Sequence, residues 1–316
     1  MALHPRHAFV LIGLTALMCA DPAGATFPGH NGRIAYTSQY FDPPAYSRGR
    51  PLARPSDCGP ADAGAIFTVL PDGRNPRHIG PRSPSAPVWA AWSPLGDQLA
   101  IEATDAGCNY GGSLQIFHAS GAVVAGTGAD VGDAELQLMG WTSEDRLLLR
   151  LGLSELWETT LTTHGTRELI RDSSTPGQPD PVDATASARG AIAFEMLRDP
   201  AGPGHIRLLV RSGHSVYLAT GEDPDWAPDA RRLVYRRAGD LWIIDTRTRR
   251  LRRLTQTAKL FEANPVWSPD GREIAFDRDR EGATGPPTGV YTMPSRGGTP
   301  RLVVAGGGQP SWQPIR

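Results

Sequence analysis

Acidic side chains recur just ahead of several short apolar segments of this 316-residue chain. The candidate ligand-binding residues are the acidic Glu135, Asp183, Asp223, Asp225 and Glu262, together with the neutral Asn264. Their acidic neighbours are Asp130, Asp133, Asp180 and Glu222. Carboxylates that gather at a concave opening focus negative potential, which attracts a cation or a basic segment of a partner. The alternative interpretation is that these side chains only solvate loops.

Other residue types capable of chemistry lack the spacing that their chemistry needs. Ser215 lies in Gly-His-Ser-Val-Tyr, which lacks the second glycine of a nucleophile elbow. The histidines are not spaced as in a metal motif; they are His78, His118, His164, His205 and His214. Residues 277–282 resemble a calcium loop, but Thr288 stands where the bidentate Glu is expected, which favours a turn. We therefore expect no catalytic residue and no dedicated metal site.

A five-residue motif followed by a short β-type segment recurs along the chain, and these repeats must position the acidic groups. The clearest copies are Trp-Ser-Pro-Asp-Gly at residues 267–271 and Trp-Ala-Pro-Asp-Ala at residues 226–230. Weaker copies begin at Trp92 and Trp141, and one copy, around Thr185, lacks the Trp. A period of about 40 to 45 residues with several short strands per unit indicates a β-propeller. We interpret the Trp as packing between neighbouring blades.

The last complete copy predicts the four antiparallel strands of one blade. They are expected at residues 264–267, 273–277, 289–293 and 301–304. A Pro-Asp-Gly turn joins the first two strands. A blade alone leaves apolar surface exposed, so blades must stack around an axis. The segments before the innermost strands then surround one mouth of the axial channel, and the acidic groups lie in those segments.

The two ends of the repeated region complement each other. Residues 310–314 stop where the turn should follow, whereas residues 31–36 begin where the second strand should resume. We predict an all-β, six-bladed propeller of four-stranded antiparallel blades over residues 26–316, closed by pairing of the N- and C-terminal strands. Closure of this kind removes exposed sheet edges.

Residues 1–25 have the pattern of a signal peptide. A basic start precedes an apolar stretch, and Ala-Gly-Ala at residues 23–25 predicts cleavage after Ala25. Cys19 raises a lipoprotein alternative, but Met18 stands where a lipobox usually has Gly, Ala or Ser. The stretch is shorter than the roughly 20 residues of a membrane span. We expect an exported protein, periplasmic or extracellular, without a membrane span.

Two cysteines remain after this cleavage, Cys58 and Cys108. Each lies in the loop after the second strand of its blade, and equivalent loops of adjacent blades lie on one face of the ring. An oxidising compartment permits a bond between them. We predict a Cys58–Cys108 disulfide, with two free thiols as the alternative.

The Trp-Ser-Pro-Asp-Gly turn, Ile-Ala-Phe at residues 274–276 and Arg-Leu-Thr at residues 253–255 resemble the WD40-like repeats of the TolB propeller family. The resemblance covers about residues 27–316 and implies the six-bladed fold. TolB proteins carry a further N-terminal domain, for which we expect no counterpart in the mature chain.

Function is less constrained than fold, because one propeller scaffold serves many functions. We expect an exported, monomeric module that binds a protein or small ligand at the channel mouth and needs no cofactor. The net charge of −1 gives no general attraction for nucleic acid. The alternative is a propeller enzyme, a metal-assisted lyase or hydrolase with its site and a divalent cation in the axial channel.

Overall fold

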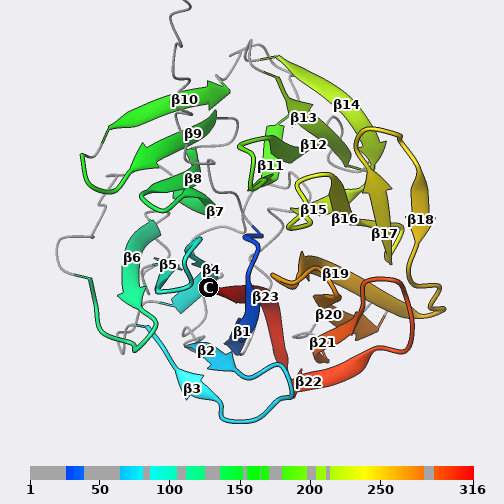
Figure 1. Ribbon diagram of the computed structural model, residues 1–316, viewed down its shortest axis with the longest axis horizontal. Coiled ribbons are helices and arrows are strands. Elements are labelled where there is room, and N and C mark those ends of the chain that lie inside the picture. Colours follow the sequence, from blue (N-terminus) through cyan, green and yellow to red (C-terminus); the bar gives the residue numbers. More distant parts are fainter. Residues whose placement is uncertain are drawn as a thin grey trace, which may run out of the picture.

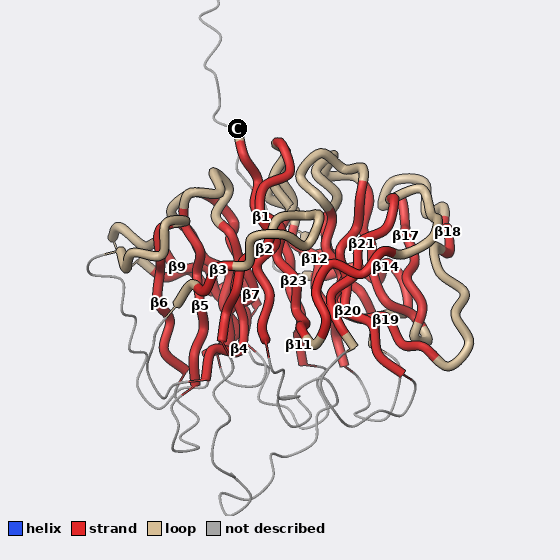
Figure 2. The backbone as a smooth tube through the Cα atoms, turned by 90° about the horizontal axis from the view of Figure 1, so that it is seen from below, coloured by secondary structure: helices blue, strands red, loops and turns tan. Residues whose placement is uncertain are grey.

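The repeated segments form six antiparallel sheets around one axis, as Figure 1 shows. The computed structural model describes residues 26–38, 65–80, 86–104, 112–124, 136–151, 155–163, 165–170, 180–197, 204–210, 214–280 and 288–316. Figure 2 shows the strands side by side around the ring, and every regular element of these residues is a strand. The predicted all-β, six-bladed propeller is confirmed.

Four blades take four consecutive strands each. Blade 3 contains β7 (Leu136–Ser143), β8 (Arg146–Leu151), β9 (Glu155–Thr160) and β10 (Thr166–Ile170). Blade 4 contains β11 (Asp180–Ala186), β12 (Ile192–Leu197), β13 (His205–Leu209) and β14 (Ser215–Thr220). Blade 5 contains β15 (Glu222–Trp226), β16 (Arg232–Arg237), β17 (Asp240–Asp245) and β18 (Leu251–Arg253). Blade 6 contains β19 (Leu260–Trp267), β20 (Glu273–Arg280), β21 (Gly289–Pro294) and β22 (Arg301–Ala305).

Blade 2 is shorter at its outer edge. It contains β4 (Ala86–Trp92), β5 (Gln98–Thr104) and β6 (Gly112–His118). Its fourth position is taken by a single antiparallel bridge between Phe117 and Val123, beside which the Val124 N–H donates to the Ile116 carbonyl at 2.9 Å. A tight turn after His118 therefore leads to a single bridge at the position where the other blades have a fourth strand.

Blade 1 closes the ring from both ends of the chain. It contains β1 (His30–Ser38), β2 (Ala65–Val69), β3 (Arg77–His78) and β23 (Gly307–Ile315). The strand order is β23-β1-β2-β3, with Ile34 opposite Trp312. The predicted closure is confirmed, and it occurs because the C-terminal segment supplies the innermost strand that the N-terminal repeat lacks.

Each repeat Trp packs against the preceding blade. Trp267 of blade 6 is fully buried with Leu241 and Ile243 of blade 5, and Trp226 of blade 5 is buried in a cluster with Ile206 of blade 4. Burial of a Trp removes about 150–250 Å² from water, so these side chains hold neighbouring blades together. The role predicted for them is confirmed.

The degenerate repeat lies in blade 4. The residue opposite the first apolar position of the second strand is Trp in the other five blades, but in blade 4 it is Ala186, opposite Ile192. The missing Trp therefore belongs one residue after Thr185. Ala186 is buried in one apolar cluster with Phe194 of the same blade and Leu148 of blade 3.

Gly96 is expected to be essential to the closing junction. It has a φ of 70°, and a Cβ placed on it would lie 1.8 Å from the Pro314 carbonyl oxygen of β23. Its own carbonyl accepts a 2.6 Å hydrogen bond from Gln313 Nε2. We expect Gly96→Ala to lower the free energy of unfolding by about 2–3 kcal/mol through backbone strain and displacement of β23.

The matched control is Gly121→Ala. Gly121 also has a positive φ, 95°, but nothing lies within 4 Å of the position that its Cβ would take. Only the backbone cost applies there, so we expect a loss of about 1 kcal/mol in urea unfolding. Equal losses for the two variants would contradict the role of Gly96 at the junction.

Candidate functional site

A β-bulge in each of three neighbouring inner strands carries a polar side chain to the channel. Asp183, Asp223 and Asn264 have φ of 44°, 51° and 47°, and the strand register shifts at each of them. Asp and Asn adopt this left-handed conformation more readily than other side chains. The bulges interrupt the ladder, which frees these residues from strand pairing.

Asp183 and Asp223 were predicted to lie in connections ahead of the inner strands, which is wrong, whereas Asn264 was correctly predicted in the strand at residues 264–267. All three lie inside β11, β15 and β19. Each inner strand begins ahead of its apolar segment. The polar residues pair with the second strand before the bulge, and the apolar residues pair with that strand after the bulge.

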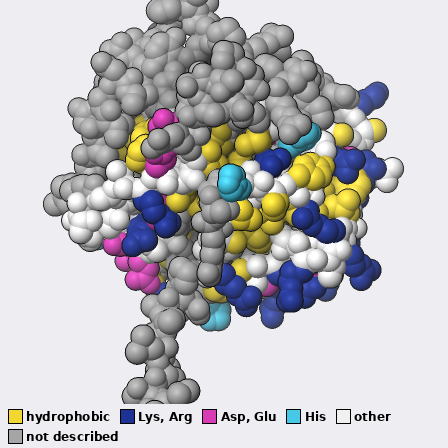
Figure 3. All heavy atoms as spheres, turned by 90° about the horizontal axis from the view of Figure 1, so that it is seen from above, with side chains coloured by type: hydrophobic (Ala, Val, Ile, Leu, Met, Phe, Trp, Pro, Cys, Tyr) yellow, Lys and Arg dark blue, Asp and Glu magenta, His cyan; other side chains and the backbone are white. Residues whose placement is uncertain are grey.

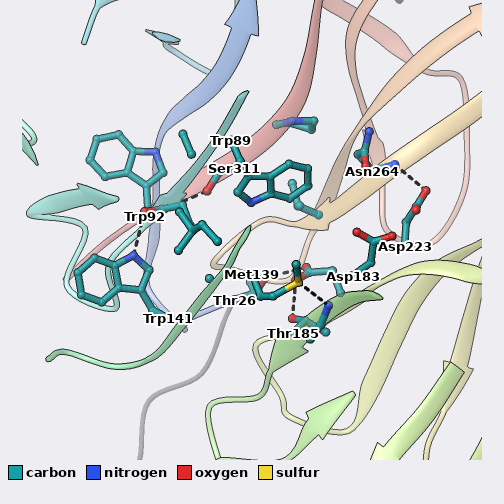
Figure 4. A pocket seen from close by; sticks show the side chains of 18 of the residues that line it. Thr26, Trp89, Trp92, Met139, Trp141, Asp183, Thr185, Asp223, Asn264 and Ser311 are labelled. Carbon is teal, nitrogen blue, oxygen red and sulfur yellow. Dashed lines mark hydrogen bonds between the residues drawn. The ribbon is translucent and has the colours of Figure 1, made fainter. Parts of the chain in front are cut away.

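The three bulges face a cavity of about 100 Å³ in the channel, to which all six blades contribute. Figure 4 shows Asp183, Asp223 and Asn264 on one side of it and Trp89, Trp92 and Ser311 on the other. The cavity has room for an ammonium group, the tip of a guanidinium or a hydrated metal ion. It is smaller than the pockets of about 300 Å³ or more that bind drug-sized ligands.

Asp183, Glu195 and Asp223 form the tightest acidic group beside this cavity. One carboxylate oxygen from each lies within 4.8 Å of the others. Burial and repulsion from Asp223 raise the pKa of Asp183 to about 7, and burial with repulsion from Asp183 raises the pKa of Glu195 well above its ordinary value. Arg236 partly balances the group through a 2.8 Å contact of its Nε with Asp223 Oδ2. An added cation would favour the ionised form of all three carboxylates.

Asp225 lies deeper on the same wall. Its Oδ2 accepts hydrogen bonds from the Trp267 N–H and from Thr26 Oγ1, both at 2.8 Å, and its Oδ1 is 3.4 Å from Thr185 Oγ1. Burial raises the pKa of Asp225 to about 7, although these hydrogen bonds act in the opposite direction. The structure thus brings four of the six candidate residues to one cavity: Asp183, Asp223, Asp225 and Asn264.

The other two candidates do not line the described cavity. Glu262 is fully buried, pairs with Arg278 at 3.0 Å and accepts hydrogen bonds from Thr255 and Thr257. Its role in the structure is to hold blade 6 to the end of blade 5. Glu135 lies outside the described residues, as do Asp130 and Asp133.

Sequence reasoning missed a belt of buried polar residues just outside the inner strands. The belt comprises the residue that follows the apolar triplet of each second strand: Thr37, Glu102, Arg150, Glu195, Arg236 and Asp277. Acidic and arginine side chains alternate from blade 2 to blade 6. The signal was present in the sequence, because these residues occupy one repeat position.

The acidic belt residues cap the bulges of the next blade. The N–H groups of Leu138, Asp223 and Gln309 donate to Glu102, Glu195 and Asp277 at 2.7, 3.4 and 2.8 Å. A bulge leaves backbone groups without strand partners, and a buried N–H needs an acceptor. The belt therefore fixes the bulges that present the channel residues.

The remaining sequence candidates lie away from the cavity. Ser215 begins β14, the outermost strand of blade 4, where its Oγ accepts a 2.7 Å hydrogen bond from Arg207 Nε. His78 lies on the outermost strand of blade 1, and His205 packs edge-on against Tyr217. His164 is outside the described residues, as are Cys58 and Cys108, so the predicted disulfide stays a prediction.

Residues 277–280 are not the turn that the sequence suggested. They continue β20, and Asp277 is buried and bonded to Gln309 and Asn264 instead of lying in a calcium loop. Pairing with Gly289 and Val290 of β21 keeps this segment extended.

The net charge of −1 is a sum over the whole chain, and the described arginines are unevenly distributed over the surface. Exposed arginines of blade 5 lie on its outer strands and turns; they are Arg231, Arg237, Arg247, Arg249, Arg250, Arg252 and Arg253. Figure 3 shows Lys and Arg side chains gathered on the described part of one outer face. Exposed carboxylates such as Asp72, Glu144 and Asp229 also lie on the outside, whereas Asp183, Asp223 and Asp225 line the cavity.

Comparison with known proteins supports the fold. A solved protein from Agrobacterium tumefaciens described as TolB aligns with 89% of this chain and 92% of its own, with a TM-score of 0.56 and 16% identity. This chain has the fold of a TolB-like six-bladed propeller. A chain of hydrazine synthase from Kuenenia stuttgartiensis aligns with 91% of this TolB-like propeller over 47% of its own length, with a TM-score of 0.63 and 11% identity. A chain of a nidogen–laminin complex aligns with 89% of it over 98% of its own length, with a TM-score of 0.58 and 10% identity.

Sequence comparison adds one curated relative. The uncharacterised peptidase YuxL of Bacillus subtilis is 30% identical over 122 residues, which is 34% of the TolB-like chain and 18% of YuxL. No family model matches the chain. The described part of the chain contains no helix with the length and apolar character of a membrane span.

Proposed function

We propose that this TolB-like propeller is an exported binding module that takes a cationic group into its axial channel. The observation that carries the proposal is the Asp183 carboxylate, which makes no hydrogen bond or ion pair to the described residues although it lines the cavity beside Asp223. Arg150 and Arg236 attract this carboxylate. They do not offset its burial and the repulsion from Asp223, which raise the pKa of Asp183 to about 7, so a ligand that brings positive charge is favoured beside it.

The shape of the cavity supports a small cationic head over a bulky ligand. Its volume of about 100 Å³ suits a lysine ammonium or an arginine tip presented by a partner protein. Trp89 lines the opposite wall and is only partly buried, so its ring can contact the aliphatic stem or the cation itself. Export rests on the signal-peptide pattern of residues 1–25.

Asp183→Asn is expected to weaken cation binding by about tenfold, which equals about 1.4 kcal/mol. The probe is a fluorescent hexalysine peptide at low salt, measured by anisotropy. No hydrogen bond or ion pair joins Asp183 to the described residues, and its pKa is raised to about 7, so the variant should melt no lower than the wild type near pH 5 and above it at pH 8.

The matched control is Asp229→Asn in the Trp-Ala-Pro-Asp-Ala turn. Asp229 is half-exposed and bonds only to its own turn, at the end of β15 opposite to Asp223. We expect unchanged peptide affinity. Equal affinity of the Asp183 and Asp229 variants would refute the channel as the binding surface.

A second candidate function is a metal-assisted lyase or hydrolase, favoured by the three oxygen ligands of Asp183, Glu195 and Asp223. Such ligands suit Ca²⁺, Mg²⁺ or Mn²⁺. Calorimetric titration of the purified protein with each metal separates the candidates. One tightly bound ion that is lost in Glu195→Gln supports the enzyme, whereas peptide binding without metal supports the module.

A further inference from the structure

The first described residues of the chain lie inside the ring. Figure 1 shows the start of the dark-blue ribbon near the centre of the propeller, ahead of β1. Thr26 and Phe27 are 6% and 3% exposed, and Phe27 packs with Leu138 and Trp141 of blade 3. The Gly29 N–H donates to the Pro269 carbonyl at 3.2 Å, which anchors the segment before it enters β1. This N-terminal segment therefore forms part of the wall of the channel.

Thr26 contacts a carboxylate that has no cationic partner in the described chain. Its Oγ1 donates to Asp225 Oδ2 at 2.8 Å. The other donors to Asp225 are neutral as well: the N–H groups of Trp267 and Trp226 and the Thr185 hydroxyl. Arg236 forms ion pairs with Glu222 and Asp223. Asp225 is only 7% exposed, so water cannot compensate for a missing counter-charge.

The backbone nitrogen of Thr26 is close to this carboxylate. Three bonds separate it from Oγ1, which places the nitrogen within about 7 Å of Asp225 Oδ2. Thr26 also lines the cavity together with Asp183 and Asp223. In the uncleaved chain this nitrogen is a neutral amide bonded to Ala25. The sequence predicts cleavage at that same bond, after Ala-Gly-Ala at residues 23–25.

We propose that removal of residues 1–25 completes the channel, because the new α-ammonium of Thr26 becomes the counter-charge of Asp225. Hydrolysis of the Ala25–Thr26 bond consumes one water, leaves a carboxylate on Ala25 and creates the amine on Thr26. That amine takes up a proton at neutral pH, since α-amino groups have a pKa of about 8. Cleavage at this bond would thus also add a positive charge, the α-ammonium of Thr26, to the cavity.

This inference rests on the proposed export for cleavage in the cell, but its charge pairing can be tested on purified chains. Residues 26–316 contain every described strand, so the mature chain keeps the whole propeller. Three chains are compared: residues 26–316 with a free amine, the same chain acetylated on Thr26, and a chain that begins one residue earlier at Ala25. The acetylated chain is matched in sequence and lacks only the charge.

The free-amine chain is expected to melt about 3 °C or more above the acetylated chain at pH 7. Its advantage should be largest where the amine is protonated and Asp225 is ionised, and it should disappear as pH rises through the raised pKa of the amine in the folded state. It should also fade at lower pH as Asp225 becomes protonated, because burial raises the pKa of Asp225 to about 7 and the ammonium lowers it again. Reductive methylation of the Thr26 amine should be about tenfold slower than that of an exposed peptide amine. Asp225→Asn should abolish the difference in melting temperature, whereas Thr26→Val, which removes only the hydroxyl, should keep it.

Equal melting of the free and acetylated chains, or an amine as reactive as an exposed one, overturns the inference without any variant that could misfold. N-terminal sequencing of protein from the exported fraction tests the cleavage. A start at Thr26 supports it, and a start at another residue overturns this inference while leaving the proposed function in place. Protein that stays inside the cell with residues 1–25 attached overturns the proposed export instead.

Discussion

A chain that ends at Gly306 is expected to lose cooperative folding altogether. The deletion removes β23, the innermost strand of blade 1, and exposes the inner edge of β1 along its length. It also removes Trp312, which is 6% exposed and packs with Ile34 of blade 1 and Ala275 of blade 6. Loss of such a Trp alone costs about 3–5 kcal/mol, a large part of the stability of a typical domain. Urea unfolding followed by tryptophan fluorescence measures this loss.

Removal of Arg316 alone provides the control for the truncation. Its side chain is 68% exposed and contacts Glu144 in an exposed ion pair, so we expect a change within about 0.5 kcal/mol. Supplying residues 307–316 as a separate peptide should restore a cooperative transition in the truncated chain. A truncated chain with the wild-type unfolding midpoint would contradict closure by β23.

The stability of the protein is expected to fall as pH rises from about 4.5 to 7. Burial raises the pKa of Glu102 and of Asp277 to about 7, so the folded protein keeps protons that the unfolded chain has lost in this range. Since the folded state binds more protons there, the free energy of unfolding decreases with pH. A pKa difference of one is worth about 1.4 kcal/mol, so each belt carboxyl lowers stability by up to a few kcal/mol at pH 8. Melting temperatures across this range measure the effect.

Glu102→Gln should flatten part of this pH profile. Its amide oxygen can still accept the 2.7 Å hydrogen bond from the Leu138 N–H, while the group no longer titrates. We expect the variant to be more stable than the wild type at pH 8 and similar to it near pH 5. Asp245→Asn is the contrasting control, because hydrogen bonds from Thr248 lower the pKa of Asp245 to about 2 and its effect is constant above about pH 4. Parallel wild-type and Glu102→Gln profiles would refute the role of the belt.

The expected effects of deleting β23 and of ionising the belt carboxyls depend on the same kind of contact between blades. The belt carboxylates accept N–H groups of bulges that belong to the next blade, and β23 carries one such bulge at Gln309, bonded to Asp277 of blade 6. A carboxylate that accepts a bulge N–H both helps to close the ring at β23 and holds the bulges that carry the channel residues. Charge in the belt therefore affects both stability and the geometry of the cavity.

The sequence by itself determined the fold. The repeat spacing indicated six blades, and the complementary ends at residues 31–36 and 310–314 predicted the pairing of β1 with β23. It also indicated the role of Trp267 and its equivalents. These features are recognisable because each depends on a pattern within one repeat or on the order of repeats along the chain.

Only the tertiary structure decided which residues share the cavity. It separated Glu262, which is fully buried, from Asp183 and Asp223, although all three precede apolar runs in a similar way. It also placed Thr26 against Asp225, 199 residues away. The difference arises because a bulge turns a side chain by changing one φ angle, and because contacts across the ring depend on the closed circle instead of the local pattern.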